Sequence, residues 1–568
     1  MDLIKLLEEI DNGAQAEIIS DRKPLELVSS LSKQRNLEVP LGQLICELGG
    51  GAHEILRSKH KRNTLFMALK TEQRNEISEC ISESDIFNFR LTVDKKLALH
   101  RLFSVEDRSS LSDDTTIDNS KIVGVSPKYG LFEHQSKALI ECKTYLDSEN
   151  PQVMLHMPTG SGKTRTSMHL IARYLNQSPN TLIVWLVAGK ELCEQAANEF
   201  EESWSYLGER PIPLIKLWSD KSGIHSKYTN TMSVRNNAPT EVDFQESPWP
   251  LELKDGVIIA SLDSLRSLMS TWEPSDRHVR RSSVSLIIFD EAHQSVAPTY
   301  RTVIETLQSP SQPYTKLIGL TATPGRKHYG GSSDGNNELV KLFGNQFVQL
   351  KIEGYTSPVD YLVENGYLAK LEKEKLTIVN QNFSTEELAS FNKSISASMD
   401  VPDDILKILG YSATRNLQIV ERVERLVMEE GHKRVLVFSP SVEAAIILSN
   451  ICKCIGINSS FVHASSTDRD SVIRKYKAND DEARVIFNYG VLTTGFDAPK
   501  TSAVVIARPT TSLVLLNQMA GRAIRGHLVG GNNDAILITV VDIEIPVLVE
   551  PVAQFHAFDE SWRINNNG

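Results

Sequence analysis

The octapeptide MPTGSGKT, Met157 to Thr164, constrains the fold of this chain more than any other segment. An apolar run, VMLHM, leads into it, and apolar residues at helical spacing follow it. Glycines in such a strand, loop and helix unit let backbone N–H groups face phosphate oxygens at the start of a helix. Lys163 adds a positive charge for the β and γ phosphates, and the Thr164 hydroxyl can bind Mg²⁺. The other loop residues expected around the phosphates are Pro158, Thr159, Gly160, Ser161 and Gly162.

Short β-branched runs alternate with helical patterns in two parts of the chain. The first part contains VMLHM, TLIVWLV, VIIAS, SLIIFD and KLIGLTA, and the second contains RVLVFSP, SSFVHA, RVIFNYG, SAVVIAR and AILITVVD. Buried strands that alternate with helices are typical of a doubly wound parallel α/β sheet. The pattern therefore predicts two α/β domains, at residues 126–325 and 431–545.

The remaining segments lack this alternation. Apolar residues at helical spacing predict a helical N-terminal accessory module at residues 1–105, and the polar stretch 106–125 suits a linker. Residues 326–430 are expected to form a mostly helical connector between the two α/β domains, and residues 546–568 a tail. Residues 217–255 show no clear period and indicate an insertion in the first domain.

The charge balance limits how this chain could meet nucleic acid. It contains 61 Lys and Arg against 72 Asp and Glu, so its formal net charge is −11. No overall basic field attracts nucleic acid or an anionic membrane, and a nucleic-acid site must be a local patch or cleft. The length of 568 residues and the hydrophobic content of 40% predict three or four domains with cores of their own.

Cysteine usage and the chain start bear on the compartment. Among six cysteines only Cys452 and Cys454 are close, without a second pair at zinc-ligand spacing. The start, MDLIKLLEEIDNG, carries acids in place of a basic leader region, and no run of about 18 apolar residues occurs. We expect reduced thiols in a cytoplasmic protein.

Three further groups suit the hydrolysis of a bound nucleotide. Asp290 and Glu291 follow the apolar run SLIIF, where Asp290 could hold Mg²⁺ and Glu291 could act as general base on water. Arg522 and Arg525 stand three positions apart on an expected helix, and arginine matches the spread charge of a transferring phosphoryl group. Gln518, which begins the same segment QMAGRAIRG, is the remaining catalytic candidate.

Nine segments stand in one order: FEHQ, MPTGSGKT, LVAGKELCEQ, ASLDSL, DEAHQ, GLTATPGR, VFSP, VLTTGFDAP and QMAGRAIRG. Together they resemble the motif series of superfamily 2 helicases, of DEAD/DEAH-box type in the broad sense, over about residues 129–542. The resemblance implies two tandem RecA-like P-loop domains that use ATP and Mg²⁺.

The resemblance also implies roles for individual residues. Gln135 is similar to the glutamine that reads adenine, and Gly495 and Asp497 to a segment that touches nucleotide and nucleic-acid backbone. The residues implied to couple hydrolysis to lobe movement are His293, Thr321 and Thr323. The residues implied to grip nucleic-acid phosphates are Gly189, Lys190, Ser261, Ser439, Thr493 and Thr494. The same Ser, Thr and Gly residues could instead cap helices.

The details of the motifs favour one branch of the superfamily. DEAHQ with GLTATPGR and GFDAP is more similar to XPB-like, RadD-like and restriction-subunit (ResIII) helicases than to RNA DEAD-box proteins. We therefore expect an ATP-dependent helicase or translocase, on DNA rather than RNA, in repair, restriction or phage defence. A nucleotide-gated scaffold that does not unwind, and an RNA helicase, are the alternatives.

The basic run RSKHKR, at residues 57–62, is the main charge feature of the helical module. A solvated helix face is the default interpretation, and a phosphate-contacting patch or a docking surface for a protein partner is the other. The sequence does not decide between them.

Overall fold

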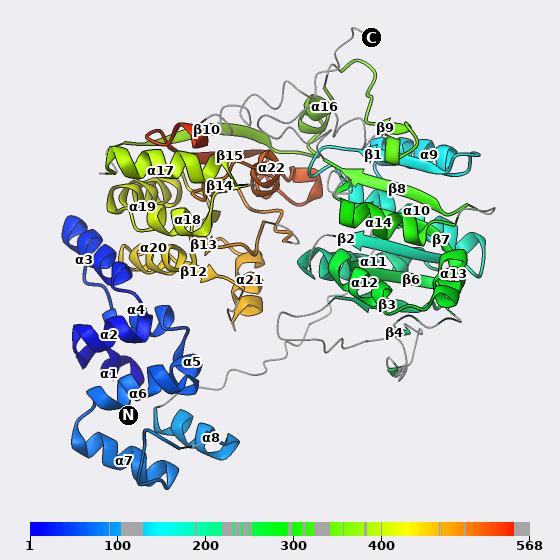
Figure 1. Ribbon diagram of the computed structural model, residues 1–568. Helices are drawn as coiled ribbons and strands as arrows, with labels where there is room; N and C mark the ends of the chain where they lie inside the picture. The colour runs from blue at the N-terminus through cyan, green and yellow to red at the C-terminus, as the bar shows by residue number, and fades with distance from the viewer. Residues whose placement is uncertain are drawn as a thin grey trace, which may run out of the picture.

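The computed structural model contains two α/β lobes and a helical module (Figure 1). It describes residues 1–89, 91–103, 129–187, 190–218, 231–232, 240–241, 249, 251, 253–292, 298–309, 314–322, 341–355, 357–379, 383–398, 400–464, 466, 468–493 and 496–549. The expected linker at 106–125 and most of the expected tail lie outside these residues. Figure 1 shows the lobes side by side, with the module below the second lobe.

The first lobe is built on one parallel sheet. Among the described residues, seven strands lie in the order β3-β6-β2-β7-β8-β1-β9. In chain order they are β1 (Gln152–His156), β2 (Leu182–Val187), β3 (Leu214–Leu217), β6 (Gly256–Ser261), β7 (Val284–Asp290), β8 (Lys316–Thr321) and β9 (Phe347–Gln349). A short antiparallel pair, β4 (Thr231–Met232) and β5 (Thr240–Glu241), lies in the expected insertion.

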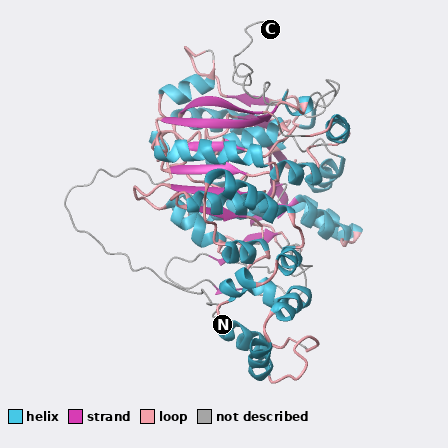
Figure 2. Cartoon of the chain, turned by 90° about the vertical axis from the view of Figure 1, so that its left-hand side faces the viewer, coloured by secondary structure: helices cyan, strands magenta, loops and turns pink. Residues whose placement is uncertain are grey.

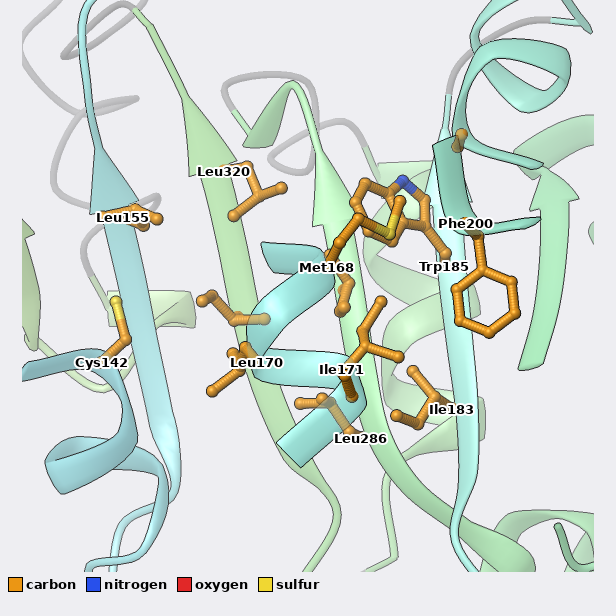
Figure 3. Packing of buried hydrophobic residues seen from close by; sticks show 14 of the residues in the cluster. Cys142, Leu155, Met168, Leu170, Ile171, Ile183, Trp185, Phe200, Leu286 and Leu320 are labelled. Carbon is orange, nitrogen blue, oxygen red and sulfur yellow. The ribbon is translucent and has the colours of Figure 1, made fainter. Parts of the chain in front are cut away.

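Helices cover both faces of this sheet, as a doubly wound fold requires. They are α9 (Glu133–Leu146), α10 (Lys163–Gln177), α11 (Lys190–Leu207), α12 (Leu262–Ser270), α13 (Pro274–Ser283) and α14 (Pro298–Leu307). Alternate residues of β2 enter two different cores, with Ile183 and Trp185 on one face and Val184 and Leu186 on the other. Figure 3 shows Ile171 of α10 packed near Ile183 and Leu286. Burial of both faces explains why these strands read as continuous apolar runs.

The second lobe has a parallel sheet of its own. Six strands of the described chain lie in the order β10-β15-β14-β11-β13-β12. In chain order they are β10 (Lys370–Ile378), β11 (Arg434–Phe438), β12 (Ser459–Val462), β13 (Arg484–Asn488), β14 (Ala503–Ile506) and β15 (Asp534–Asp542). Its helices are α19 (Ala413–Met428), α20 (Val442–Cys454), α21 (Arg469–Lys477) and α22 (Leu513–Ala520), with a 3₁₀ turn at His527–Val529. Two tandem RecA-like sheets after a helical region confirm the predicted fold class, and Figure 2 shows the strands between layers of helices.

The stretch 326–430 is not the separate helical connector that we expected. Its strand β9 joins the first sheet, and β10 pairs along its whole length with β15 of the second sheet. Strand β10 (KLEKEKLTI) carries four successive charged residues, and its side chains are exposed or half-buried up to Ile378, as suits an edge strand. Helix α19 packs into the core of the second lobe through Ile419, Val423 and Leu426. The second lobe therefore begins near residue 370, because strand pairing, which the sequence does not display, extends it.

Three further helices lie in this stretch: α16 (Pro358–Glu364), α17 (Thr385–Ser396) and α18 (Asp403–Gly410). Helices α17 and α18 share a small apolar cluster with Ile545 and Leu548, which follow β15. They form an added layer on the second lobe, apart from its two main cores.

The N-terminal module is helical, as predicted. Its helices are α1 (Leu3–Glu9), α2 (Asn12–Ile19), α3 (Lys23–Arg35), α4 (Leu41–Leu48), α5 (Ala52–Arg57), α6 (Lys59–Ala68), α7 (Thr71–Ile81) and α8 (Val93–Leu102). It has its own core, which includes Leu7, Ile45 and Phe66. The basic run lies at the junction of α5 and α6, where Arg62 is buried and donates to the carbonyl oxygen of Leu56 at 2.9 Å.

The module docks on the second lobe through α3 and α4. Leu27, Leu31 and Leu44 belong to the same apolar cluster as α19 and α20. Polar contacts surround this cluster: Arg35 pairs with Glu424, and the amide of Asn450 donates to Glu47 at 2.6 Å. The module therefore packs on the second lobe through both apolar and polar contacts.

No described helix combines the length and apolarity that a bilayer crossing would need. All six cysteines are free thiols in the structure.

We predict that Leu31→Ala loosens the module. Leu31 is fully buried, and a buried Leu→Ala change costs ~2–5 kcal/mol through lost packing and the cavity left behind. Hydrogen–deuterium exchange should become faster in α3 and α20 and stay unchanged in β1 and β2. Leu97→Ala, at a side chain with 43% exposure on α8, is the matched control. Unchanged exchange in α20 of Leu31→Ala would show that this contact does not hold the module.

Candidate functional site

The loop between β1 and α10 has the backbone that a phosphate cradle needs. Gly160 and Gly162 have φ of +85° and +93°, which L side chains rarely adopt. A Cβ on Gly162 would lie 2.1 Å from Nε2 of Gln135, so only glycine fits there. The N-cap of α10 is Gly162, which has no side chain to cap the first turn, so the N–H groups of that turn suit a phosphate. The residues present fit ATP phosphates.

Gln135 lies against this loop from the start of α9. Its Nε2 donates to the carbonyl oxygen of Ser161 at 2.9 Å, and its Oε1 accepts from the N–H of Phe132 at 3.0 Å. The imidazole of His134 lies 3.2 Å from the same Ser161 oxygen, and burial lowers the pKa of His134. Each polar atom of the Gln135 amide retains one free hydrogen-bonding position, which suits the N6 and N7 edge of adenine.

The acidic pair stands at the end of β7, beside the loop. Burial raises the pKa of Asp290, the neighbouring charge of Glu291 raises it further, and Lys163 opposes both. Burial likewise lowers the pKa of Lys163, against the attraction of Glu291 and Asp290. Glu291 has a φ of 54°, a left-handed conformation that costs a non-glycine residue about 1–3 kcal/mol. Such strain at the end of a strand is typical of a functional position.

Thr164 and Asp290 are the residues that would hold Mg²⁺. They offer a hydroxyl and a carboxylate oxygen, which are hard ligands. The described residues contain no group of three or more His, Cys, Asp or Glu side chains placed to hold a metal. A site with few protein ligands suits Mg²⁺, which usually retains water and takes phosphate oxygens.

The second lobe supplies the opposite wall of the site. Gln518, on α22, donates from Nε2 to Oε1 of Glu291 at 3.3 Å. Arg525 reaches the P-loop: its Nη1 lies 3.0 Å from the point where a Cβ on Gly160 would stand. The Nε of Arg525 lies 3.4 Å from Oδ1 of Asp497. Arg522 donates to the carbonyl oxygens of Phe496 and Gln518, and burial lowers the pKa of Arg522 to about 10. The structure therefore brings all four predicted catalytic residues to one seam.

From their spacing we expected the two arginines to lie on a helix. They do not. Helix α22 ends at Ala520, and both arginines occupy the turn and bridge that follow it. Gly521 explains the close approach, because a Cβ there would lie 2.5 Å from Cγ2 of Thr159 in the P-loop. Gly526 is equally confined, since its Cβ would lie 2.1 Å from the carbonyl oxygen of Gly366.

The segment between α16 and β10 completes the site, and sequence reasoning missed it. Leu368 lies 2.8 Å from the Cβ position of Gly160, and the Tyr367 ring lies 4.6 Å from Phe132 and 4.9 Å from His134, between ring centroids. The N–H of Ala369 donates to Ile524 at 3.0 Å, which ties the segment to the arginine turn. None of the nine motif segments includes these residues. The only sequence feature that could have indicated them is the Tyr and Leu that follow Gly366.

A cavity of about 420 Å³ lies beside this contact. Pro158 and Thr159 line it from the first lobe, and Asn517 of α22 and Gly521, directly after α22, line it from the second. The lobes therefore touch at the P-loop tip without filling the space next to it.

The implied coupling and phosphate-gripping residues are only partly described. Thr321 ends β8, is fully buried, and accepts a hydrogen bond from the N–H of Met157 at 3.2 Å, next to the P-loop. Ser261 caps α12, with Oγ accepting from the N–H of Ser264 at 3.3 Å. Thr493 is 8% exposed. The predicted residues outside the described part of the chain are Gly189, His293, Thr323, Thr494, Gly495 and the side chain of Lys190.

Ser439 is a further phosphate-gripping candidate that the structure describes. Its side chain is fully buried after β11, and its N–H donates to the carbonyl oxygen of Asn488 at 2.8 Å. Its contact with a polymer stays a prediction.

Two family models match this chain. Residues 128–326 match the type III restriction enzyme res subunit (ResIII), and residues 418–527 match the helicase conserved C-terminal domain (Helicase_C).

Three curated relatives align with most of the chain. IRC3 of Saccharomyces cerevisiae, named as an ATP-dependent helicase, is 24% identical over 70% of this chain and 50% of that protein. The mitochondrial irc3 of Schizosaccharomyces pombe is 25% identical over 72% and 57%. The type I restriction enzyme EcoKI endonuclease subunit of Escherichia coli is 22% identical over 70% and 33%. The chain thus spans less than two thirds of each relative.

We predict that Gly162→Ala abolishes nucleotide binding. The added Cβ would displace Gln135 from Ser161 and strain the P-loop backbone, so a fluorescent ATP analogue should lose measurable affinity in equilibrium titration. Gly431→Ala is the matched control, since Gly431 also has positive φ but nothing within 4 Å of its Cβ position. Parental affinity in Gly162→Ala would contradict the cradle.

Proposed function

We propose that this chain, which belongs to superfamily 2 of the helicases and carries ResIII and Helicase_C domains, is an ATP-driven motor on nucleic acid, with DNA as its track. One observation carries the proposal. Gln518 and Arg525 of the second lobe contact Glu291 and the P-loop of the first. A hydrolysis site divided between two lobes is complete only when the lobes close, and closure is the movement that a motor needs.

Each residue has a role that its position supports. The P-loop N–H groups and Lys163 bind the β and γ phosphates. Thr164 and Asp290 would hold Mg²⁺, which when bound neutralises charge on those phosphate oxygens. Glu291 accepts the proton of the water that attacks the γ phosphorus, and the hydrogen bond from Gln518 orients its carboxylate.

The arginines act on the leaving phosphate. Charge moves onto the phosphoryl oxygens in the transition state, and guanidinium groups match that distribution. Arg525 lies at the P-loop, and Arg522 lies beside it, held by the carbonyl oxygen of Phe496. Both come from the second lobe, so rate acceleration depends on closure. Alternate grips on the strand by the two lobes then give directional stepping.

DNA is the favoured polymer for two reasons. The first lobe matches a restriction-enzyme subunit model, and a restriction endonuclease subunit is among the relatives. Repair, restriction or phage defence are the corresponding roles. The net charge of −11 is compatible with this, because backbone N–H groups and hydroxyls at strand ends can bind phosphates without a basic field.

We predict that Glu291→Gln reduces kcat for ATP hydrolysis by ~10²–10⁴-fold while ATP still binds, because the proton acceptor is lost. Lys163→Ala should abolish turnover through loss of phosphate binding. Steady-state ATPase assays, with circular dichroism to verify the fold, test both. Glu305→Gln, on the surface of α14, is the control. Parental turnover in both site variants would refute the site.

We predict that DNA stimulates ATP hydrolysis by the parent protein. Steady-state ATPase with Mg²⁺ is measured alone and with single-stranded DNA, duplex DNA and RNA over a salt series. Polymer affinity should fall linearly in a plot of log K against log salt, because phosphate contacts release counterions. Stronger stimulation by RNA would show that RNA, and not DNA, is the polymer on which the protein acts. No stimulation by any polymer would favour the nucleotide-gated scaffold.

A further inference from the structure

The segment between helices α17 and α18 reaches the base of α22, the helix that precedes the arginine turn. We call residues 384–410, which contain these helices, the α17–α18 arm. Asp400 stands between the two helices and points its carboxylate at the loop 507–512, which leads from β14 to α22. Its Oδ1 accepts from the Thr510 hydroxyl at 2.7 Å, the Thr511 N–H at 2.8 Å and the Thr511 hydroxyl at 3.4 Å. One oxygen thus holds three donors of this loop.

These bonds lead directly into α22. The Thr510 hydroxyl, which donates to Asp400, also accepts from the N–H of Ser512 at 3.0 Å. Ser512 is the N-cap of α22, and its Oγ accepts from the N–H of Leu515 at 3.3 Å. Gln518 lies one turn farther along the helix, where it donates to Glu291. Asp400 is therefore connected to the hydrolysis site through a chain of hydrogen bonds and one short helix.

The other end of the loop is held as firmly. Nη2 of Arg415, on α19, donates to the carbonyl oxygen of Ala507 at 2.6 Å. The same guanidinium pairs with Asp542 at 2.8 Å, and both side chains are almost fully buried. This buried pair holds the start of the loop at Ala507. Asp400 holds the second half of the loop, at Thr510 and Thr511.

The arm also touches strand ends that lie away from the ATP site. The Tyr489 hydroxyl, directly after β13, donates to Asp403 at 3.1 Å. Gly410, at the end of α18, packs on Ser441 and Pro440, with the Ser441 oxygen 3.2 Å from its Cβ position. Pro440 belongs to the segment VFSP of the motif series, and Tyr489 lies two positions before the segment VLTTGFDAP. The arm thus joins them to the base of α22.

We propose that Asp400 is a positioning residue for α22, through which the α17–α18 arm sets the approach of Gln518, Arg522 and Arg525 to the P-loop. The role in catalysis rests on the proposed ATP hydrolysis. Asp400 lies outside the helicase motifs and touches no nucleotide-binding residue, so it acts only through the loop and the helix.

The test compares Asp400→Ala, Asp400→Asn and Asp404→Ala in the full chain. Asp404 is an exposed acid on the same arm and serves as the charge-matched control. Asp400→Ala should lower kcat for ATP by about 10- to 100-fold, the range expected when catalytic groups are misplaced. KM for ATP should change by less than about twofold, because ground-state binding is on the first lobe. Asp400→Asn retains the acceptor Oδ1 and should recover most of the parental kcat.

A second measurement does not depend on turnover. The Thr511 N–H donates to Asp400, so hydrogen–deuterium exchange at Thr511 and the first turn of α22 should become faster in Asp400→Ala and stay parental in Asp404→Ala. A parent without ATPase under any condition would refute the proposed function, while this exchange would still test the contact. Parental kcat in Asp400→Ala, or parental exchange in α22, would overturn the positioning role.

Discussion

The desolvation of opposite charges at one seam is the constraint on which this structure depends. Lys163 and Asp290 are half-buried and partly desolvated, so each charge would be costly there without the other, and Glu291 adds a second negative charge that favours the charged form of Lys163. The parallel sheet places them together, because the P-loop follows β1 and the acidic pair ends β7, at the same edge. The second lobe then covers this edge with Gln518 and Arg525. A nucleotide with Mg²⁺ would meet charges that are already aligned.

Close backbone approach makes that cover possible. Gly160 meets Leu368 and Arg525, and Gly521 meets Thr159, at distances where an added Cβ would force the neighbouring side chains to shift. Since the lobes touch through glycines, small rotations of the second lobe change the distances from its polar groups to the phosphates. The cavity of about 420 Å³ beside this contact leaves room for such rotation.

The second lobe has additional layers that the first lobe lacks in the described residues. The helical module packs on α19 and α20 through Leu31 and Leu44, and the α17–α18 arm packs near the base of α22. Both additions are attached to the lobe that brings the arginines. The buried pair of Arg415 with Asp542 joins α19, on which the module packs, to β15 of the sheet.

The sequence by itself determined the local units and their chemistry. Runs such as LIVWLV and the GSGKT core specify buried strands and a phosphate loop, because side-chain burial and glycine backbone freedom are local properties. Tertiary structure decided the rest. The sequence pattern placed the residues of β10 in a connector, because the pairing of β10 with β15 depends on residues more than 150 positions away. Likewise Asp400 and Leu368 carry no motif, and only the approach of distant segments in the folded chain gives them partners.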